Sequence, residues 1–189
     1  MVIFVNGCVR ENSRTLKLAQ AVLESISDTD TIEEIRLYPN GPEGLDAEKL
    51  RLREELLATK TYDHPMFRYA KQFAAADTIV MAAPYWDLAF PAKMRAYLEE
   101  ITVSGITFQY ASDGIPQGLC KAKRLIYVTT AGGPIVQDFG FAYVKSLARL
   151  FYGISDTLLV KAEGLDIWGN DPSEILEQAK REIPTILNM

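Results

Sequence analysis

Five short apolar runs, separated by stretches with helical periodicity, are the feature that most constrains the fold of this chain. The runs cover residues 2–5, 32–37, 79–82, 125–128 and 158–160. Several of them are continuous rather than alternating, which is typical of strands that are buried on both faces. Strands that alternate with helices form parallel, doubly wound sheets, and five strands favour the order 2-1-3-4-5. We therefore expect an α/β fold with helices on both faces of a five-stranded parallel sheet.

The helical stretches carry apolar residues at spacings of three and four. The expected core positions are Leu16, Ala19, Leu23 and Ile26, then Met94, Tyr97, Leu98 and Ile101, and then Val144, Leu147, Ala148 and Phe151. A last helix has Asp171 as its N-cap and Pro172 at its first position, and Glu174 completes a capping box. We expect Pro184 to bend or end this helix.

Composition points to one globular domain, residues 1–189, that acts on small molecules. Of the 189 residues 48% are apolar, and the net charge of −5 comes from interspersed charges without a basic stripe, so nucleic acid is not an expected partner. No apolar run approaches the ~18 residues of a membrane span, and the first residues lack a signal peptide's charged region. Cys8 and Cys120 have no zinc-site spacing, so no metal is expected. A reduced, cytoplasmic protein is predicted, with Cys120 as a small apolar filler.

One connection, residues 39–65, is long for such a fold, and long connections are often functional. Within it, residues 46–59 mix leucines with many charges and predict a helix. This excursion could be a lid over a site or a packed surface helix. His64, the only histidine, precedes Pro65, and we expect it to start a helix rather than to catalyse.

Three loops follow predicted strands and carry chemistry. The first, residues 6–15, begins a helix and brings Arg10, Ser13, Arg14 and Thr15 to its N-terminus, where free N–H groups favour a phosphate. A simpler interpretation is that Asn12 or Ser13 only caps the helix.

The second loop, residues 83–91, contains neighbouring aromatics and a carboxylate, Tyr85-Trp86-Asp87, which a plain turn does not need. The third, residues 129–134, contains Gly132-Gly133, which would let a flat ligand approach the backbone or simply form a turn. In the predicted sheet all three loops converge at the point where the strand order reverses, where ligands bind. A phosphate loop beside two loops suited to a flat ring fits FMN best.

At these residues the sequence resembles the flavodoxin-like NAD(P)H:quinone reductases, and most closely the FMN-dependent NADH-azoreductases. The resemblance extends over most of the chain and is carried by the order and spacing of several short motifs. They are Ser13-Arg14-Thr15, Ala83-Pro84-Tyr85-Trp86-Asp87, Gly105-Ile106-Thr107-Phe108-Gln109-Tyr110, Gly118-Leu119, Lys123, Thr130-Ala131-Gly132-Gly133 and Ala162-Glu163-Gly164.

This resemblance implies a flavodoxin-like fold, a homodimer, FMN as cofactor and NADH or NADPH as electron donor. It implies ping-pong hydride transfer through the flavin to a quinone or azo compound, with no catalytic side chain. The implied cofactor-binding residues are Cys8, Ser13, Arg14, Thr15, Pro84, Tyr85, Trp86, Asp87, Leu88, Thr130, Ala131, Gly132 and Gly133. The family positions that wall the substrate pocket fall on Tyr110 and Phe151.

Two residues depart from the family pattern. The family has Asn where this chain has Asp87, and a carboxylate beside the flavin should disfavour its anionic reduced form and lower its potential. The azoreductases often have Arg where this chain has Ala131, so a preference for anionic azo dyes is not expected to carry over.

Two other functions remain open from the residues alone. Cys8 and Arg14 have the C-x5-R spacing of cysteine-dependent phosphatases, and Asp171-Pro172 resembles their acid loop. A non-catalytic, flavodoxin-type electron carrier is the second alternative. Separately, apolar positions in excess of one stripe on two helices favour a dimer, although packing against the sheet explains them too. They are Ala92, Tyr97, Phe141 and Tyr152.

Overall fold

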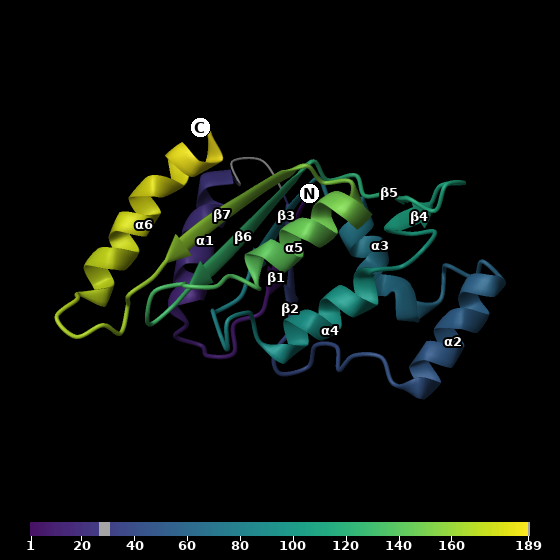
Figure 1. Ribbon diagram of the computed structural model, residues 1–189, viewed down its shortest axis with the longest axis horizontal. Coiled ribbons are helices and arrows are strands. Elements are labelled where there is room, and N and C mark those ends of the chain that lie inside the picture. The colour runs from purple at the N-terminus through teal and green to yellow at the C-terminus, as the bar shows by residue number, and fades with distance from the viewer. Residues whose placement is uncertain (27–30, 189) are drawn as a thin grey trace.

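The computed structural model describes residues 1–26 and 31–188. Within them, five parallel strands form one sheet in the order β2-β1-β3-β6-β7 (Figure 1). The strands are β1 (Val2–Asn6), β2 (Ile32–Arg36), β3 (Thr78–Ala82), β6 (Arg124–Thr130) and β7 (Asp156–Ala162). Each corresponds to one of the predicted runs, whose ends differ by at most two residues. Numbered along this sheet alone, the order is 2-1-3-4-5, so the predicted topology is confirmed.

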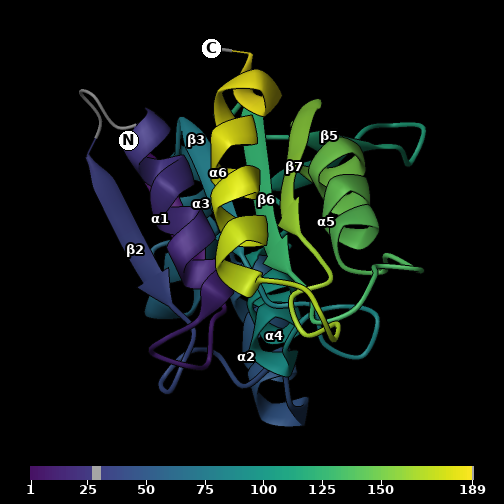
Figure 2. The same ribbon diagram turned by 90° about the vertical axis from the view of Figure 1, so that its left-hand side faces the viewer.

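Helices cover both faces because alternate strand residues point to opposite sides. On β1, Val2 and Phe4 pack in the core layer under α1 (Arg14–Ile26) and α6 (Pro172–Leu187). Ile3 and Val5 pack in the other layer, under α3 (Arg68–Ala75), α4 (Ala92–Ile101) and α5 (Phe141–Leu147). Figure 2 shows α1 and α6 side by side on their face of the sheet. Both faces of the three central strands, β1, β3 and β6, are therefore buried, as their continuous apolar sequences require.

The last helix starts as predicted but does not stop at its proline. Asp171 caps α6, since its Oδ1 accepts hydrogen bonds from the N–H groups of Ser173, at 2.8 Å, and Glu174, at 3.4 Å. Pro184 lies inside the helix, which continues to Leu187, so of the two expected effects, a bend or an end, the proline does not end the helix. Near the C-terminus the proline removes few helical hydrogen bonds, and the burial of Leu187 holds the final turn on the core.

Several elements were not predicted from the sequence. They are α3, the short helix η1 (Pro65–Phe67), the π-helical turn Ala148–Tyr152 after α5, and the hairpin of β4 (Phe108–Tyr110) and β5 (Pro116–Gly118). The hairpin lies at the amino-terminal edge of the sheet, because the residues after β5 lead directly into β6. The fully buried Tyr97 and Tyr152 belong to the core, so these two positions give no support to a dimer.

The long connection contains the predicted helix, α2 (Ala47–Ala58), capped by Asp46. The guanidinium of Arg53 donates hydrogen bonds to the backbone carbonyls of Glu99, at 3.0 Å, and Thr102, at the end of α4. In Figure 1, α2 lies beyond the end of α4, far from the carboxyl ends of β6 and β7. This position favours a packed surface helix over a lid.

Two minor predictions are confirmed. His64 is the N-cap of η1, and its Nδ1 accepts a hydrogen bond from the N–H of Met66 at 3.2 Å. Cys120 is buried in the apolar core. No helix in the described part of the chain is long and apolar enough to cross a membrane.

Candidate active site

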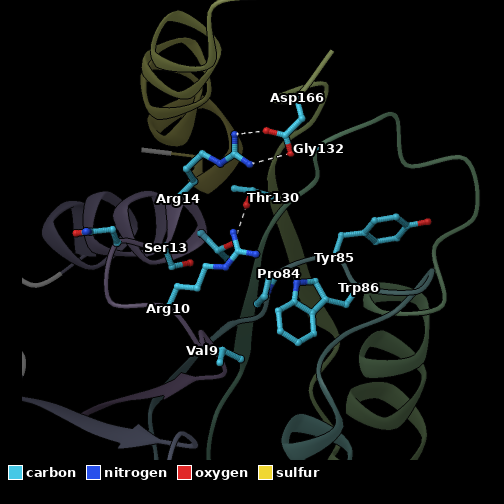
Figure 3. A pocket seen from close by; sticks show the side chains of 12 residues that line it. Val9, Arg10, Ser13, Arg14, Pro84, Tyr85, Trp86, Thr130, Gly132 and Asp166 are labelled. Carbon is cyan, nitrogen blue, oxygen red and sulfur yellow. Dashed lines mark hydrogen bonds and ion pairs between the residues drawn. The ribbon is translucent and has the colours of Figure 1, made fainter. Parts of the chain in front are cut away.

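The carboxyl ends of β1, β3 and β6 enclose a cavity of about 280 Å³, which we call the first cavity (Figure 3). Its walls come from the three loops that the sequence singled out, together with the loop after β7. The lining residues are Val9, Arg10, Asn12, Ser13, Arg14, Thr15, Pro84, Tyr85, Trp86, Thr130, Gly132 and Asp166. Eight of them are among the residues predicted to bind cofactor, so the expected convergence of these loops is observed.

One side of the cavity presents hydroxyl groups at the start of α1. Ser13 caps this helix, because its Oγ accepts a hydrogen bond from the N–H of Leu16 at 3.3 Å. The capping interpretation is therefore correct, but Ser13 also lines the cavity. The Oγ1 atoms of Thr15 and Thr130 lie 2.6 Å apart and tie the first turn of α1 to the end of β6. First-turn N–H groups have no intrahelical acceptor, so together with these hydroxyls they can donate to an anion.

Arg14 is held in place by an aspartate from the loop after β7. Its Nη1 and Nη2 donate to the two carboxylate oxygens of Asp166 at 2.9 and 3.1 Å, and Nη1 also donates to the carbonyl of Leu165 (Figure 3). This pairing lowers the pKa of the Asp166 carboxyl below its usual value. Because the fork is engaged in a bidentate pair, Arg14 is oriented before any ligand binds.

The opposite side of the cavity is flat and apolar. Figure 3 shows the Pro84 ring and the Trp86 indole facing the hydroxyl groups of the α1 loop. Tyr85 points the other way, and its hydroxyl donates to the backbone carbonyl of Gln137 at 2.7 Å. Trp86 is therefore the side chain placed to stack on a ring, whereas Tyr85 anchors the neighbouring loop.

Asp87 and Leu88 form the tip of a tight turn beside the cavity rather than part of its wall. Trp86 and Ala89 exchange two backbone hydrogen bonds, at 2.8 and 3.3 Å, across the turn. Asp87 and Leu88 have φ angles of 49° and 68°, the left-handed conformation that both central residues of a type I′ turn adopt. Leucine rarely adopts this conformation, and such strain concentrates at functional sites.

The Gly-Gly loop is braced by the loop after β7. The N–H of Asp166 donates to the carbonyl of Gly132 at 2.8 Å, and the N–H of Gly164 donates to that of Gly133 at 3.0 Å. A Cβ atom on Gly132 would lie 2.3 Å from Asp166 Oδ2, whereas one on Gly133 would meet no atom within 4 Å among the described residues. Ala131 is buried, with both backbone groups bonded, and it does not line the first cavity.

Cys8 lies behind the first cavity rather than in it. It lines a second cavity of about 390 Å³, at the carboxyl ends of β1 and β2, and its N–H donates to Asn6 Oδ1. Burial raises the pKa of the Cys8 thiol from 9.0 to about 11, although a hydrogen bond with Ser13 opposes this effect. A thiol with such a pKa is protonated at neutral pH.

Tyr110 and Phe151 are not brought to the first cavity of the same chain. Both rings contact Phe108 edge-on, at centroid distances of 5.3 and 4.9 Å. Tyr110 lies on β4, and Phe151 precedes β7, so both lie at the amino-terminal edge of the sheet. The first cavity lies at the opposite edge.

Sequence reasoning missed Val9 and Asp166 as lining residues. A signal for Asp166 was available, because it follows β7, whose carboxyl end lies at the same edge as those of its parallel neighbours. Val9 carried no such signal, since one apolar residue in a loop does not indicate a site.

Comparison with known proteins agrees with this geometry. The sequence profile of a family described as having a flavodoxin-like fold matches residues 1–187. The FMN-dependent NADH:quinone oxidoreductase 2 of Clostridium acetobutylicum is 35% identical over 183 residues, which cover 90% of each chain. The chain belongs to this flavodoxin-like family. The crystal structure of an FMN-dependent NADH-azoreductase from Bacillus anthracis in complex with FMN superposes with a TM-score of 0.81. It is 25% identical, and the match covers 97% of this chain and 95% of that one.

The similarity to these two proteins confirms the predicted resemblance to quinone reductases and azoreductases. An FMN-dependent NADH:quinone oxidoreductase of Caldicellulosiruptor saccharolyticus is also 35% identical, over 93% of this chain and 91% of that one. These relatives match this chain over nearly their full length.

Proposed function

We propose that this protein is an FMN-dependent NADH oxidoreductase that reduces quinones and azo compounds. The observation that carries the proposal is the first cavity, which has anion donors on one side and a flat apolar wall on the other. Relatives that match nearly the whole chain are named FMN-dependent NADH:quinone oxidoreductases, and a structural neighbour is an azoreductase solved with FMN.

The residues present fit FMN. A phosphate dianion would be held by the Ser13 and Thr15 hydroxyls, the first-turn N–H groups of α1 and the arginine side chains. The Trp86 indole and Pro84 would pack on the flat ring. At Gly132 a side chain would collide with the Asp166 carboxylate, so glycine leaves the Arg14–Asp166 pair of the cavity undisturbed.

Bound FMN would supply the redox chemistry, accepting a hydride equivalent from NADH and passing electrons to the acceptor. The chain's own contribution is positional. The Arg14–Asp166 pair fixes the phosphate end, and the apolar wall excludes water from one face of the ring. No side chain of the cavity is required as a general acid.

Ala131 leaves no cation at the position where azoreductases often have arginine. The Ala131 side chain is buried, and its backbone is bonded to Ala162 and Leu165. We propose that anionic azo dyes therefore gain no charge attraction at this position and that neutral acceptors are used as well as anionic ones.

The phosphatase alternative is not favoured. A phosphatase needs a thiolate nucleophile, but burial raises the pKa of the Cys8 thiol to about 11. Asp171, the residue that resembled an acid loop, is occupied as the N-cap of α6. The flavodoxin-type carrier is likewise not favoured by the relatives' names, which are those of oxidoreductases.

We propose a homodimer in which Tyr110 and Phe151 of a second copy wall the substrate pocket, because one chain holds them far from its own first cavity. Support comes from large apolar side chains that one chain leaves exposed near α5 and the hairpin, among them Val136, Phe139, Leu150 and Tyr110. Light scattering that returned the monomer mass of 21.1 kDa would contradict this arrangement.

We further propose that residues 1–189 act as one domain in the cytoplasm. The five-stranded sheet packs its two core layers against helices from the whole length of the chain. Both cysteines are free thiols, as a reducing compartment would keep them.

The proposed function is tested with purified protein and two matched tryptophan variants. The wild type should be yellow with a flavin spectrum, oxidise NADH with benzoquinone or an azo dye, and leave p-nitrophenyl phosphate intact. Trp86→Ala should weaken FMN binding, because it removes the wall of the cavity, whereas Trp168→Ala, an exposed tryptophan outside the cavity, should not. A colourless protein that hydrolyses the phosphate ester would overturn the proposal.

A further inference from the structure

The second cavity, beside Cys8, has no part in the proposed binding of the FMN ring. It opens at the carboxyl ends of β1 and β2, at about 390 Å³ within the size range of small-ligand sites. Val9 and Arg10 line both this cavity and the first one, so the two lie next to each other along the edge of the sheet. A ligand bound in the first cavity could therefore extend into the second.

We propose that the second cavity binds the adenosine diphosphate half of the nicotinamide donor. The inference rests on the proposed function, in which NADH delivers its hydride in the first cavity. A dinucleotide that places its nicotinamide there must place two phosphates, a ribose and an adenine elsewhere. The second cavity provides groups of suitable chemistry for them.

The second cavity offers arginine side chains to the two phosphates of the donor. Arg10 stands at the boundary of the two cavities, and Arg36 lies at the end of β2, in register with Asn6 of β1. Arginine is the side chain best suited to phosphate, because its planar fork donates two parallel hydrogen bonds. Arg36 is also available, since its contact with Glu34 is a single one of 3.4 Å and its side chain is 61% exposed.

The second cavity also offers an aromatic ring on which the adenine can stack. Tyr38 lines the cavity and is half-buried, and its hydroxyl accepts a hydrogen bond from the N–H of Lys93 at 3.4 Å. A ring held in this way can stack on a base with little loss of conformational entropy.

Arg36→Ala tests the proposal, with Arg51→Ala as the matched control. Each change removes one exposed arginine from an Arg–Glu pair and lowers the net charge equally, but Arg51 lies on α2 and lines neither cavity. Long-range attraction of an anionic donor is therefore reduced to a similar degree in both variants. A difference in donor binding between Arg36→Ala and Arg51→Ala therefore indicates a local contact between Arg36 and the donor.

Two readouts are taken on the FMN-loaded enzyme. The first is the KM for NADH compared with the KM for reduced nicotinamide riboside, which lacks the adenosine diphosphate half. The second is the dissociation constant of ADP-ribose, measured by calorimetry on the oxidised enzyme. A charge-assisted hydrogen bond predicts that Arg36→Ala raises the ADP-ribose constant and the ratio of the two KM values about tenfold, and that Arg51→Ala changes neither.

Three results would overturn the inference. They are wild-type enzyme that does not bind ADP-ribose, equal effects of Arg36→Ala and Arg51→Ala, and equal changes in KM for the two donors. Failure of the proposed function would look different, since the wild type would then bind no FMN or reduce no quinone with either donor.

Discussion

The hydroxyl pair of Thr15 and Thr130 permits a quantitative test of how the site is built. The two Oγ1 atoms are 2.6 Å apart, and the residues are 1% and 7% exposed. Thr130→Val keeps the shape of the side chain but removes its hydroxyl. The hydrogen bond between the two residues is then lost, and the buried Thr15 hydroxyl has lost this partner. Together these effects should lower the free energy of unfolding by about 2 kcal/mol. For a chain of this size the melting temperature should fall by about 4–8 °C.

The preceding residue on the same strand provides the control. Thr129 is 4% exposed, and its hydroxyl has no hydrogen-bond partner among the described residues. Thr129→Val makes the same chemical change one position away but removes no hydrogen bond. We expect it to leave stability unchanged or to raise it slightly, because a buried hydroxyl without a partner is costly.

The assay is urea unfolding of the FMN-free protein followed by far-ultraviolet circular dichroism. FMN is left out because a bound ligand adds its own stabilisation. The double variant Thr15→Val/Thr130→Val should be less destabilised than the sum of its single variants, since neither partner is then orphaned. The double variant should nevertheless bind FMN more weakly than the wild type, because the two residues that it replaces line the first cavity. Equal destabilisation by Thr129→Val and Thr130→Val would refute the reasoning.

Three further predictions concern charge and space. Asp77→Asn should lower the urea midpoint at neutral pH. Hydrogen bonds from Lys121 and the N-terminal amine lower the pKa of the Asp77 carboxyl from 3.8 to about 2. The stabilisation by this carboxylate is therefore present above pH 3.8 and is lost as the pH falls toward 2. If the urea midpoints of Asp77→Asn and the wild type differed as much at pH 2 as at pH 7, this prediction would be contradicted. Gly132→Ala should weaken FMN binding several-fold in fluorescence titration, because its Cβ would displace the Asp166 carboxylate, and unchanged binding would show that the space is not needed. Asp87→Asn should raise the FMN midpoint potential, because it removes a negative charge that opposes the anionic reduced flavin, and spectroelectrochemistry would measure the shift.

The fold could be predicted from the sequence because its central strands are buried on both faces. Runs such as residues 79–82 have no polar face, and only a parallel sheet covered on both sides accommodates several of them. The elements that were missed have weaker signals. The strands β4 and β5 are short, and β5 contains Pro116 and Gly118, residues that argue against strand structure, so pairing with β4 decides its conformation.

The site was predictable to the extent that it depends on strand ends. The positions of Ser13, Thr15 and Thr130 follow from the topology alone, because the carboxyl ends of neighbouring parallel strands meet at one edge. The direction of a side chain within a loop does not follow from topology. Tyr85 and Trp86 are adjacent and both line the cavity, yet the Tyr85 ring points away from it, because its hydroxyl donates a hydrogen bond to the carbonyl of Gln137, about 50 residues later in the chain.

The structure also explains why Asp87 is a clean position at which to test the effect of charge on the flavin. Its φ angle of 49° is one that Asn and Asp tolerate better than most residues, so the family's asparagine and this chain's aspartate suit the same turn. The backbone hydrogen bonds between Trp86 and Ala89 involve no side-chain atom of Asp87. Asp87→Asn should therefore leave the turn and its stability unchanged while removing one negative charge beside the first cavity. Asp87→Ala, which lacks both the charge and the tolerance for positive φ, would confound the two effects. A shift in potential that appears in Asp87→Ala but not in Asp87→Asn would assign it to the conformation of the turn and would refute the role of the carboxylate.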